Sequence, residues 1–506
     1  MAITKTNFIN YTRCRRYSAF EDIKKEKMDS NLSIEEYKKE ELYKVVSFGE
    51  RHGFKVFSWQ FPNMTQELAQ ELLPECPKEE LPITRNKNDE EEKLPVYIDF
   101  SHPRAKELLA AQWKDRMDAG IRGSMVDFGD VVPDEAVFYD GRRGDEMHNA
   151  YAYQYAKNYR ELFEQKYGDD HVLYTRGAAP GSQHFACQFG GDQLTSFQGL
   201  KYAIAGGLSA AASGLPFWGV DAGGYDGFPD QETYLRWTEY AAFCPLMRFH
   251  GTEPREPWEY DAFTVKVYRY YTWLRENLRP YIVSVAAEAH KLGIPMMRPL
   301  AMMYPEDQEA TKVWDEYLFG EDLLVAPVSD ETEEREIYFP EGRWISLWNL
   351  NDEISGPVQR SVEVPIDKIP VYIREGSFLP LRLNESLKLG ESMSESETEM
   401  ILAVVPQNDS IVKETLYERS GAKTCCGMEK NGETIQLQIS GRTAELYVML
   451  AGIHWKNTEA IVNGRTLTKV TAREGLYFTE GYLELEEGIL VKINPSAESV
   501  IKIQKK

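Results

Sequence analysis

Five short apolar runs in the first half of the chain each end on a charged or titratable residue. Two of these residues are aspartates, Asp127 and Asp192, and the other three are Arg176, Asp221 and His250. A pair of carboxyl groups can divide the roles of nucleophile and general acid if one is ionised and the other protonated. Because a βα barrel places its active site at the carboxyl ends of its strands, this pattern predicts a barrel enzyme with a carboxylate pair.

Strand and helix patterns alternate from residue 55 to about residue 292, which is typical of parallel βαβ units. The expected strands are Lys55–Gln60, Ser124–Phe128, Val172–Arg176, residues 185–189, Leu215–Val220 and Leu246–His250. The expected helices are Pro103–Ala119 with Ser101 as its N-cap, Glu146–Tyr167, Phe197–Ser213, Gln231–Phe243 and one long helix over Phe263–Leu292. A barrel of this type needs eight strands, so six candidates predict a barrel that is incomplete at its N-terminal end. Only a partial strand near Asn7–Tyr11 is expected before them.

After about Pro295 the chain changes to short β-rich runs separated by turn residues, which predicts one small sheet near 320–390 and a sandwich near 395–506. The expected fold class is therefore α/β, with a (β/α)8-type barrel followed by C-terminal all-β domains. We expect an N-terminal segment of uncertain fold over 1–43 and a catalytic βα barrel over 44–300. A proximal β-domain over 301–392 and a distal β-sandwich over 393–506 should follow.

Composition narrows the class of partner. A formal net charge of -23 argues against nucleic acid and against anionic membranes. Six scattered cysteines without a spaced pair indicate reduced thiols, and neither a signal pattern nor a long apolar run is present, so we expect a cytoplasmic protein. Eight histidines show no metal-ligand spacing, so we expect neither a metal nor a cofactor.

Several motifs, in order and at compatible spacing, resemble glycoside hydrolase family 31. They are Met-Val-Asp127-Phe-Gly-Asp, Thr-Arg176, Phe-Gly-Gly-Asp192, Trp-Gly-Val-Asp221-Ala-Gly-Gly-Tyr225, Leu-Met-Arg-Phe-His250-Gly and Glu253-Pro-Arg-Glu-Pro-Trp258. The later Ile369-Pro-Val-Tyr-Ile-Arg-Glu-Gly-Ser-Phe-Leu-Pro380 resembles that family's first C-terminal β-domain. The resemblance extends from about residue 44 to 390 and more weakly beyond.

The resemblance implies a retaining α-glycosidase in which Asp127 is the nucleophile and Asp192 is the general acid/base. In such an enzyme the two carboxyl groups lie about 5–6 Å apart and the product keeps its anomeric configuration. The implied substrate-binding residues are Arg176, Asp221, Tyr225, His250, Met125 and Phe189. Asp221 and His250 have an alternative role, in which they orient their neighbours instead of touching the sugar.

Four positions carry weaker signals. Asp130 stands where the family usually has glutamate, so its shorter side chain puts the usual contact in doubt. Met125 stands where many relatives have tryptophan, so one wall of the sugar pocket should differ. His148 and Asn149 are interpreted either as support for the site or as helix-capping residues.

The resemblance does not include the N-terminal β-sandwich and the first two barrel strands that the family usually has. A truncated gene product, one half of a split enzyme and closure by dimerisation are all compatible with this. The expected partner is thus a small-molecule or oligosaccharide substrate, and a homo-oligomer or a missing N-terminal partner segment is compatible with the sequence. The leading hypothesis is an α-glucosidase-like enzyme. The alternatives are a sulfoquinovosidase or α-xylosidase of the same family, and an inactive carbohydrate-binding relic.

Overall fold

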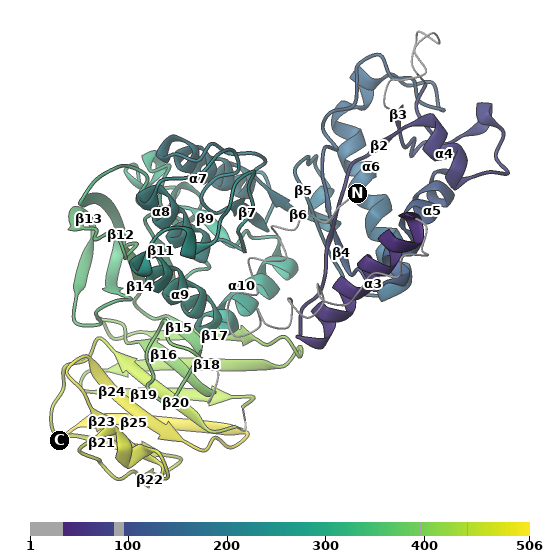
Figure 1. Ribbon diagram of the computed structural model, residues 1–506. Coiled ribbons are helices and arrows are strands. Elements are labelled where there is room, and N and C mark those ends of the chain that lie inside the picture. Colours follow the sequence, from purple (N-terminus) through teal and green to yellow (C-terminus); the bar gives the residue numbers. More distant parts are fainter. Residues whose placement is uncertain (1–33, 86–95, 394–396, 443) are drawn as a thin grey trace. The chain divides into compact units, whose positions relative to one another are not determined.

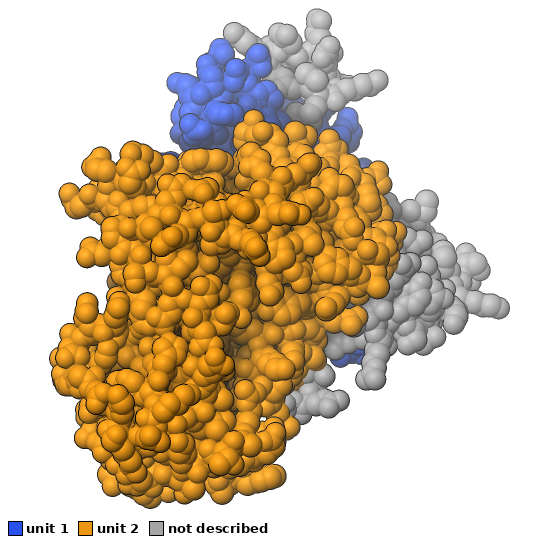
Figure 2. Space-filling view, turned by 90° about the vertical axis from the view of Figure 1, so that its left-hand side faces the viewer, with its two compact units in different colours: residues 1–191 blue, residues 192–506 orange. Residues whose placement is uncertain are grey.

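The computed structural model describes residues 34–85, 96–393, 397–442 and 444–506. The chain divides into two compact units, residues 1–191 and 192–506, which Figure 2 colours separately. The partial strand expected near Asn7–Tyr11 lies outside the described residues. The domain bounds expected from the sequence remain a prediction.

Unit 1 contains a parallel sheet covered by helices (Figure 1). Its parallel strands, in spatial order, are β1 (Ser58–Gln60), β4 (Gly123–Val126), β5 (Val172–Thr175) and β6 (Cys187–Phe189). Its helices are α3 (Ile34–Arg51), α4 (Gln66–Leu72), α5 (Ala105–Asp118) and α6 (Gly144–Tyr167), and β2 (Asn63–Met64) pairs with β3 (Val96–Tyr97). A buried aromatic cluster from α5 and α6 fills the core beneath the sheet, with Trp113, Tyr151, Tyr155 and Tyr159 fully buried.

Unit 2 begins with two parallel strands and four long helices. The strands are β7 (Trp218–Asp221) and β8 (Leu246–Arg248), and the helices are α7 (Phe197–Ala212), α8 (Gln231–Ala242), α9 (Ala262–Asn277) and α10 (Arg279–Leu292). Ser196, Asp230 and Asp261 cap α7, α8 and α9 through side-chain oxygens that accept backbone N–H bonds. All six expected strands are therefore present among the described residues, each a little shorter or shifted.

Two local predictions were wrong. The long helix over Phe263–Leu292 is two helices that break at Leu278, because Pro280 lacks an N–H and fits only the first turn of a helix. Ser101 does not cap α5, which starts at Ala105 after Arg104. The Ser101 hydroxyl instead donates to the Asp99 carboxylate at 2.6 Å.

The rest of unit 2 is β-rich, as expected. A first sheet has the strand order β13 (Glu353–Glu363), β12 (Glu334–Ser346), β14 (Val371–Arg374), β11 (Leu323–Val325), β10 (Tyr317–Phe319) and β9 (Met297–Pro299), with α11 (Leu300–Met303) after β9. A β-sandwich follows. One of its sheets runs β15 (Phe378–Leu383), β16 (Thr398–Val404), β20 (Leu446–Ala451), β24 (Gly488–Ile493) and β23 (Gly481–Glu484). The other runs β17 (Ile411–Tyr417), β18 (Lys423–Asn431), β19 (Thr434–Ser440), β25 (Glu498–Lys505), β21 (Thr458–Val462) and β22 (Arg465–Thr466).

The described residues also form short 3-10 helices: η1 (Lys78–Glu80), η2 (Ser182–His184), η3 (Pro257–Glu259), η4 (Ala310–Lys312) and η5 (Arg473–Leu476). Alternating inward-facing side chains such as Ile435, Leu437 and Ile439 on β19 form the core between the two sandwich sheets. None of the described helices is both long enough and apolar enough to span a membrane.

Candidate active site

A row of side chains crosses the carboxyl end of the parallel sheet in unit 1. Strand pairing aligns Trp59 with Met125, and Met125 with Tyr174. Side chains alternate along a strand, so the residues two positions further along share the same face. These residues are Phe61, Asp127, Arg176 and, beside Arg176 at the end of β6, Phe189. The register thus places an aspartate and an arginine between two aromatic rings.

The Asp127 carboxylate is buried and surrounded by donors. The indole N–H of Trp59 donates to Oδ2 at 3.0 Å, and the backbone N–H of Phe128 donates to Oδ1 at 2.9 Å. The Nε of Arg176 lies 3.5 Å from Oδ1. Two donors and a guanidinium stabilise the negative charge of this carboxylate, as a nucleophile requires.

Arg176 is held by several groups at once. Its Nε lies 3.8 Å from Oδ1 of Asp130, and its guanidinium carbon lies 4.0 Å above the centre of the Phe128 ring. Phe128 has a φ of 57°, which is uncommon for an aromatic residue and turns the chain sharply after Asp127. The short side chain of Asp130 therefore still reaches the arginine that contacts Asp127.

Aromatic side chains that sequence reasoning missed line the same edge. The ring of Phe61 lies 4.0 Å from that of Trp59 and 4.8 Å from that of Phe128. Trp59 and Phe61 flank the end of the first expected strand, so their strand-end position was the available signal. Met125 and Phe189 are both buried in this unit, 7% and 3% exposed.

In unit 2, Asp221 ends β7 and is buried. The Arg248 guanidinium, at the end of β8, lies 2.6 Å from its Oδ1. Burial raises the pKa of Asp221 to about 6; Arg248 opposes this shift and the Asp192 carboxylate adds to it. Oδ2 of Asp221 is buried and accepts no hydrogen bond from any described residue, so it can accept one from a ligand hydroxyl.

Arg255 ties together the loops that follow the strands of unit 2. This buried guanidinium donates to the carbonyl oxygens of Gly224, Tyr225 and Gly227, at 3.0, 3.1 and 2.7 Å. The Tyr225 N–H in turn donates to the carbonyl of Gln193 at 2.7 Å, next to Asp192. A Cβ on Gly224 would lie 2.6 Å from a carbonyl oxygen of this neighbouring loop, so glycine is required there.

Three further expected residues lie on these loops. The Tyr225 and His250 rings lie 5.3 Å apart. Burial, with Arg248 and Arg255 nearby, lowers the pKa of His250 to about 4, so its imidazole is neutral at pH 7. Asp192 is exposed, on the loop that precedes α7.

The expected residues thus fall into two groups. Unit 1 holds Asp127, Arg176, Met125 and Phe189, and unit 2 holds Asp192, Asp221, Tyr225 and His250. The expected spacing of the two catalytic carboxyl groups stays a prediction. Within the described ranges, His, Cys, Asp and Glu side chains form no group of three that could bind a metal.

His148 and Asn149 do not cap a helix. The helix α6 begins at Gly144, and its capping interaction is made by Glu146, whose carboxylate accepts the Arg143 N–H at 2.8 Å. His148 and Asn149 are exposed in the helix after this first turn. The capping interpretation is therefore wrong, and a supporting role at the site stays a prediction.

The fold and the strand-end residues define a βα-barrel protein with the polar groups of a glycosidase. The glycosyl hydrolases family 31 TIM-barrel domain matches residues 20–285, and the family 31 C-terminal domain matches residues 293–379. The chain belongs to glycosyl hydrolase family 31.

Named relatives support this membership. The chain is 32% identical to an isomaltosyltransferase of Sporosarcina globispora over 80% of its own length and 39% of the relative. It is 32% identical to an alpha-xylosidase of Emericella nidulans, over 56% of its length and 38% of the relative. A cycloalternan-forming enzyme from Listeria monocytogenes, solved with a pentasaccharide substrate, has a similar fold with a TM-score of 0.83 at 23% identity. That match covers 92% of this chain and 47% of the enzyme, so the chain spans about half or less of these relatives.

Proposed function

We propose that this chain is a retaining α-glycosidase that removes terminal α-linked glucose, with Asp127 as nucleophile and Asp192 as general acid/base. The observation that carries the proposal is the environment of Asp127. This strand-end carboxylate is buried, receives two N–H donors and faces Arg176. Such a carboxylate stays ionised and fixed in position, which suits attack on an anomeric carbon.

In the proposed mechanism, Asp127 attacks the anomeric carbon while Asp192 gives its proton to the leaving oxygen. The C–O bond to the leaving group breaks as the bond to the Asp127 oxygen forms, which produces a covalent glycosyl-enzyme. Asp192 then takes a proton from water, and the water oxygen displaces Asp127. The exposed position of Asp192 supports this part, because water must reach this carboxylate in the second step.

The polar groups of unit 2 would hold the sugar hydroxyls. The buried Oδ2 of Asp221 can accept one hydroxyl proton, and neutral His250 can donate or accept one hydrogen bond at each ring nitrogen. The ring of Tyr225 offers a flat face beside His250. Together these groups suit a neutral ring with several hydroxyl groups.

Charge balance favours α-glucoside over sulfoquinovoside among the substrates considered. Arg176 faces two aspartates, and Arg248 faces Asp221, so both cations already lie against carboxylates. A sulfonate would need a cation that is not neutralised in this way. An α-xyloside is neutral like an α-glucoside, and a direct assay compares these two substrates.

Stereochemistry tests the mechanism. Proton NMR of an α-glucoside reaction should show α-glucose as the first product, and an initial β anomer would overturn the assignment of Asp127 as nucleophile. Release of nitrophenol from α-glucoside, α-xyloside and α-sulfoquinovoside separates the substrate alternatives. Absence of turnover with retained sugar binding would instead favour the carbohydrate-binding relic.

A further inference from the structure

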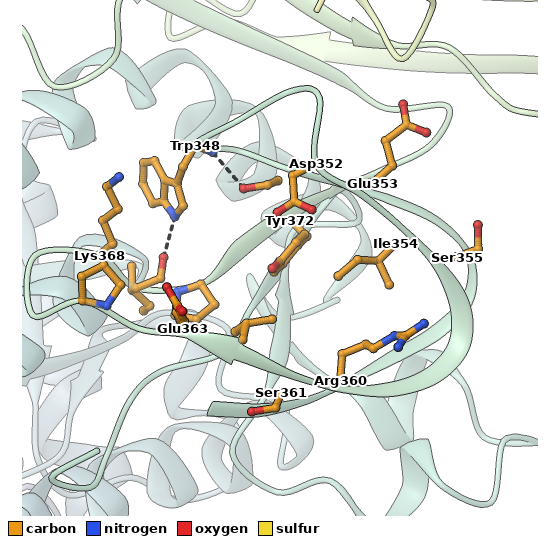
Figure 3. Close-up of a pocket in the computed structure, with 15 residues that line it drawn as sticks. Trp348, Asp352, Glu353, Ile354, Ser355, Arg360, Ser361, Glu363, Lys368 and Tyr372 are labelled. Atoms are coloured by element: carbon orange, nitrogen blue, oxygen red, sulfur yellow. Dashed lines mark hydrogen bonds between the residues drawn. The ribbon is translucent and has the colours of Figure 1, made fainter. Parts of the chain in front are cut away.

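We propose that a cavity in the first β-sheet of unit 2 is a second carbohydrate site, which binds an α-glucan chain without cleaving it. The cavity has a volume of about 600 Å³, within the range of small-molecule sites. The turn between β12 and β13, strand β13 itself and the segment that leads into β14 form its walls (Figure 3). None of the candidate active-site residues lines it.

The indole of Trp348 forms one wall. Its Nε1–H donates to the carbonyl of Ile369 at 2.7 Å, and its backbone N–H lies 3.3 Å from the Ser346 hydroxyl oxygen (dashed in Figure 3). The polar edge of the ring is therefore already satisfied, while the side chain remains partly exposed. Such a ring can offer its flat face to the C–H groups of a sugar.

Charged side chains surround this ring without neutralising one another. Figure 3 shows Lys368 on the same side as Trp348, with Arg360 on the opposite side and Asp352 between them. Across the described part of the chain, no ion pair is formed by Asp352, Arg360, Glu363 or Lys368. The cavity thus combines a guanidinium and an ammonium group as donors, carboxylates as acceptors, and the face of an aromatic ring.

This combination selects among classes of ligand. The lining holds both cationic and anionic groups, so a phosphate or sulfonate would meet carboxylates and a free cation would meet Arg360 and Lys368. Charged side chains stand among the apolar ones, which does not suit a lipid tail. A neutral polyol uses all of these groups, because each hydroxyl both donates and accepts.

A buried network fixes the wall in place. Arg236, on α8, donates to the carbonyls of Val364, Pro365 and Lys368 at 2.7, 3.1 and 3.4 Å. Its guanidinium also lies 3.2 Å from the buried Glu239 carboxylate. A wall held by a buried arginine is pre-organised, which lowers the entropic cost of binding.

A second network supports the same segment. The Tyr271 hydroxyl donates to the carbonyl of Asp367 and accepts the N–H of Ile369, each at 3.1 Å. Ile369 is the residue whose carbonyl accepts the Trp348 indole N–H. The aromatic platform and the charged wall are therefore fixed to the same buried framework.

The choice of an α-glucan rests on the proposed function, whereas the site itself does not require turnover. Native gel electrophoresis in the presence of dextran measures binding independently of hydrolysis. We would use the full chain carrying Asp127→Ala, so that dextran is not consumed. Dextran should retard this protein, and Arg360→Gln with Asp352→Asn should weaken the retardation about tenfold in apparent Kd.

The matched control is Arg419→Gln, which changes an exposed arginine outside the cavity and should leave retardation unchanged. In the wild-type background, Arg360→Gln and Asp352→Asn should leave hydrolysis of an aryl α-glucoside unchanged. Trp348→Phe keeps a ring while removing the indole N–H, so it should retain more binding than Trp348→Ala.

Two outcomes would overturn the proposal. One is the absence of retardation by dextran, and the other is equal retardation of the cavity double variant and the Arg419→Gln control. Thermal melting of each variant excludes unfolding as the cause of a loss. If the wild-type chain does not hydrolyse an aryl α-glucoside while dextran still retards the Asp127→Ala chain, the proposed function is refuted and the second binding site is not.

Discussion

At the scale of single residues, the buried carboxyl groups of Asp127 and Asp221 differ in the groups that stabilise their negative charge. Asp127 receives N–H donors and a guanidinium, which favour its ionised form. Asp221 is more deeply buried, and its single close cation, Arg248, only partly offsets the burial that raises its pKa. The contacts of Asp127 thus favour the charged carboxylate, whereas burial favours the neutral form of Asp221.

Trp59→Phe tests the donor to Asp127. The variant keeps an aromatic ring and removes the indole N–H, so one charge-assisted hydrogen bond is lost. Such a bond contributes roughly 1.5–3 kcal/mol, which corresponds to a loss of about 10- to 150-fold in kcat/KM. Trp314→Phe, at a half-exposed tryptophan of unit 2, is the control and should retain full activity. A change of less than twofold in Trp59→Phe would show that this bond does not serve catalysis.

Asp192→Asn tests the general acid. Loss of the proton donor should slow substrates with poor leaving groups strongly and activated aryl glycosides much less. Rates of both substrate types, measured for variant and wild type, give the comparison. Equal slowing of the two would exclude Asp192 as the acid, and Asp226→Asn on the neighbouring loop provides the matched control.

The pH dependence of substrate binding tests Asp221. Its pKa of about 6 means that the hydroxyl-accepting carboxylate is present above pH 6 and is lost as pH falls through that value. The kcat/KM profile should therefore show an acid limb near pH 6 in the free enzyme. In Asp221→Asn the residual activity should lack this limb. The limb remaining at the same pH would assign it to another group.

At the scale of elements, the loops after β6, β7 and β8 behave as one assembly because Arg255 and a few backbone bonds connect them. Thr252 contributes as well, since its N–H donates to the Tyr225 carbonyl at 2.9 Å and its hydroxyl accepts the Gly227 N–H at 3.0 Å. Loops linked in this way present side chains with little freedom. That arrangement suits a site whose polar groups must meet several hydroxyls at once.

Arg255→Met tests this connection. The variant removes the side-chain donor to the Gly224 and Gly227 carbonyls, while the Tyr225 carbonyl keeps the Thr252 N–H. An unsatisfied buried group costs about 1–3 kcal/mol. We expect the free energy of unfolding of unit 2 to fall by roughly 3 kcal/mol or more, measured by urea titration. Arg279→Met, at an arginine whose side chain is 44% exposed, should change it by less than about 0.5 kcal/mol. Equal stability of the two variants would contradict the role of Arg255.

At the scale of the whole molecule, several carboxyl groups are buried outside the candidate site. Burial raises the pKa of both Glu239 and Glu316 to about 8, with Arg236 and Arg335 respectively opposing the shift. Burial also raises the pKa of Asp322 and Glu414. Below pH 8, Glu239 and Glu316 therefore retain a proton that the unfolded chain releases above its ordinary pKa.

This retention predicts how stability depends on pH. Between the unfolded pKa near 4.5 and the folded pKa near 8, the native state binds more protons, so the free energy of unfolding falls as pH rises. Glu239→Gln cannot lose a proton, so its melting temperature should fall less between pH 5 and pH 8 than that of the wild type. Glu232→Gln, which changes another glutamate of α8, is the control. An identical pH dependence in Glu239→Gln and wild type would show that Glu239 is ionised throughout.

Much of the fold could be predicted from the sequence, because local patterns specify it. The six apolar runs form parallel strands, and the short β-rich runs after Pro295 form three further sheets. Both were predictable because the periodicity of apolar side chains is a local property of the sequence. The charged residues at strand ends were visible for the same reason. The break at Leu278 was also local, and Pro280 was the signal that the helix prediction overlooked.

Only the tertiary structure decided which groups hold the strand-end residues. The Trp59 indole donates to the Asp127 carboxylate, 68 positions away in the sequence. Arg248 on β8 lies against Asp221 on the neighbouring strand β7, and Arg236 donates to carbonyls about 130 residues further along the chain. Such contacts depend on strand register and on how helices cover the sheet, which no local pattern encodes. The cavity beside Trp348 has the same origin, because its walls come from a hairpin and from a segment fixed by buried side chains of α8 and α9. The sequence therefore determined which residues could do chemistry, and long-range packing determined their protonation, support and surroundings.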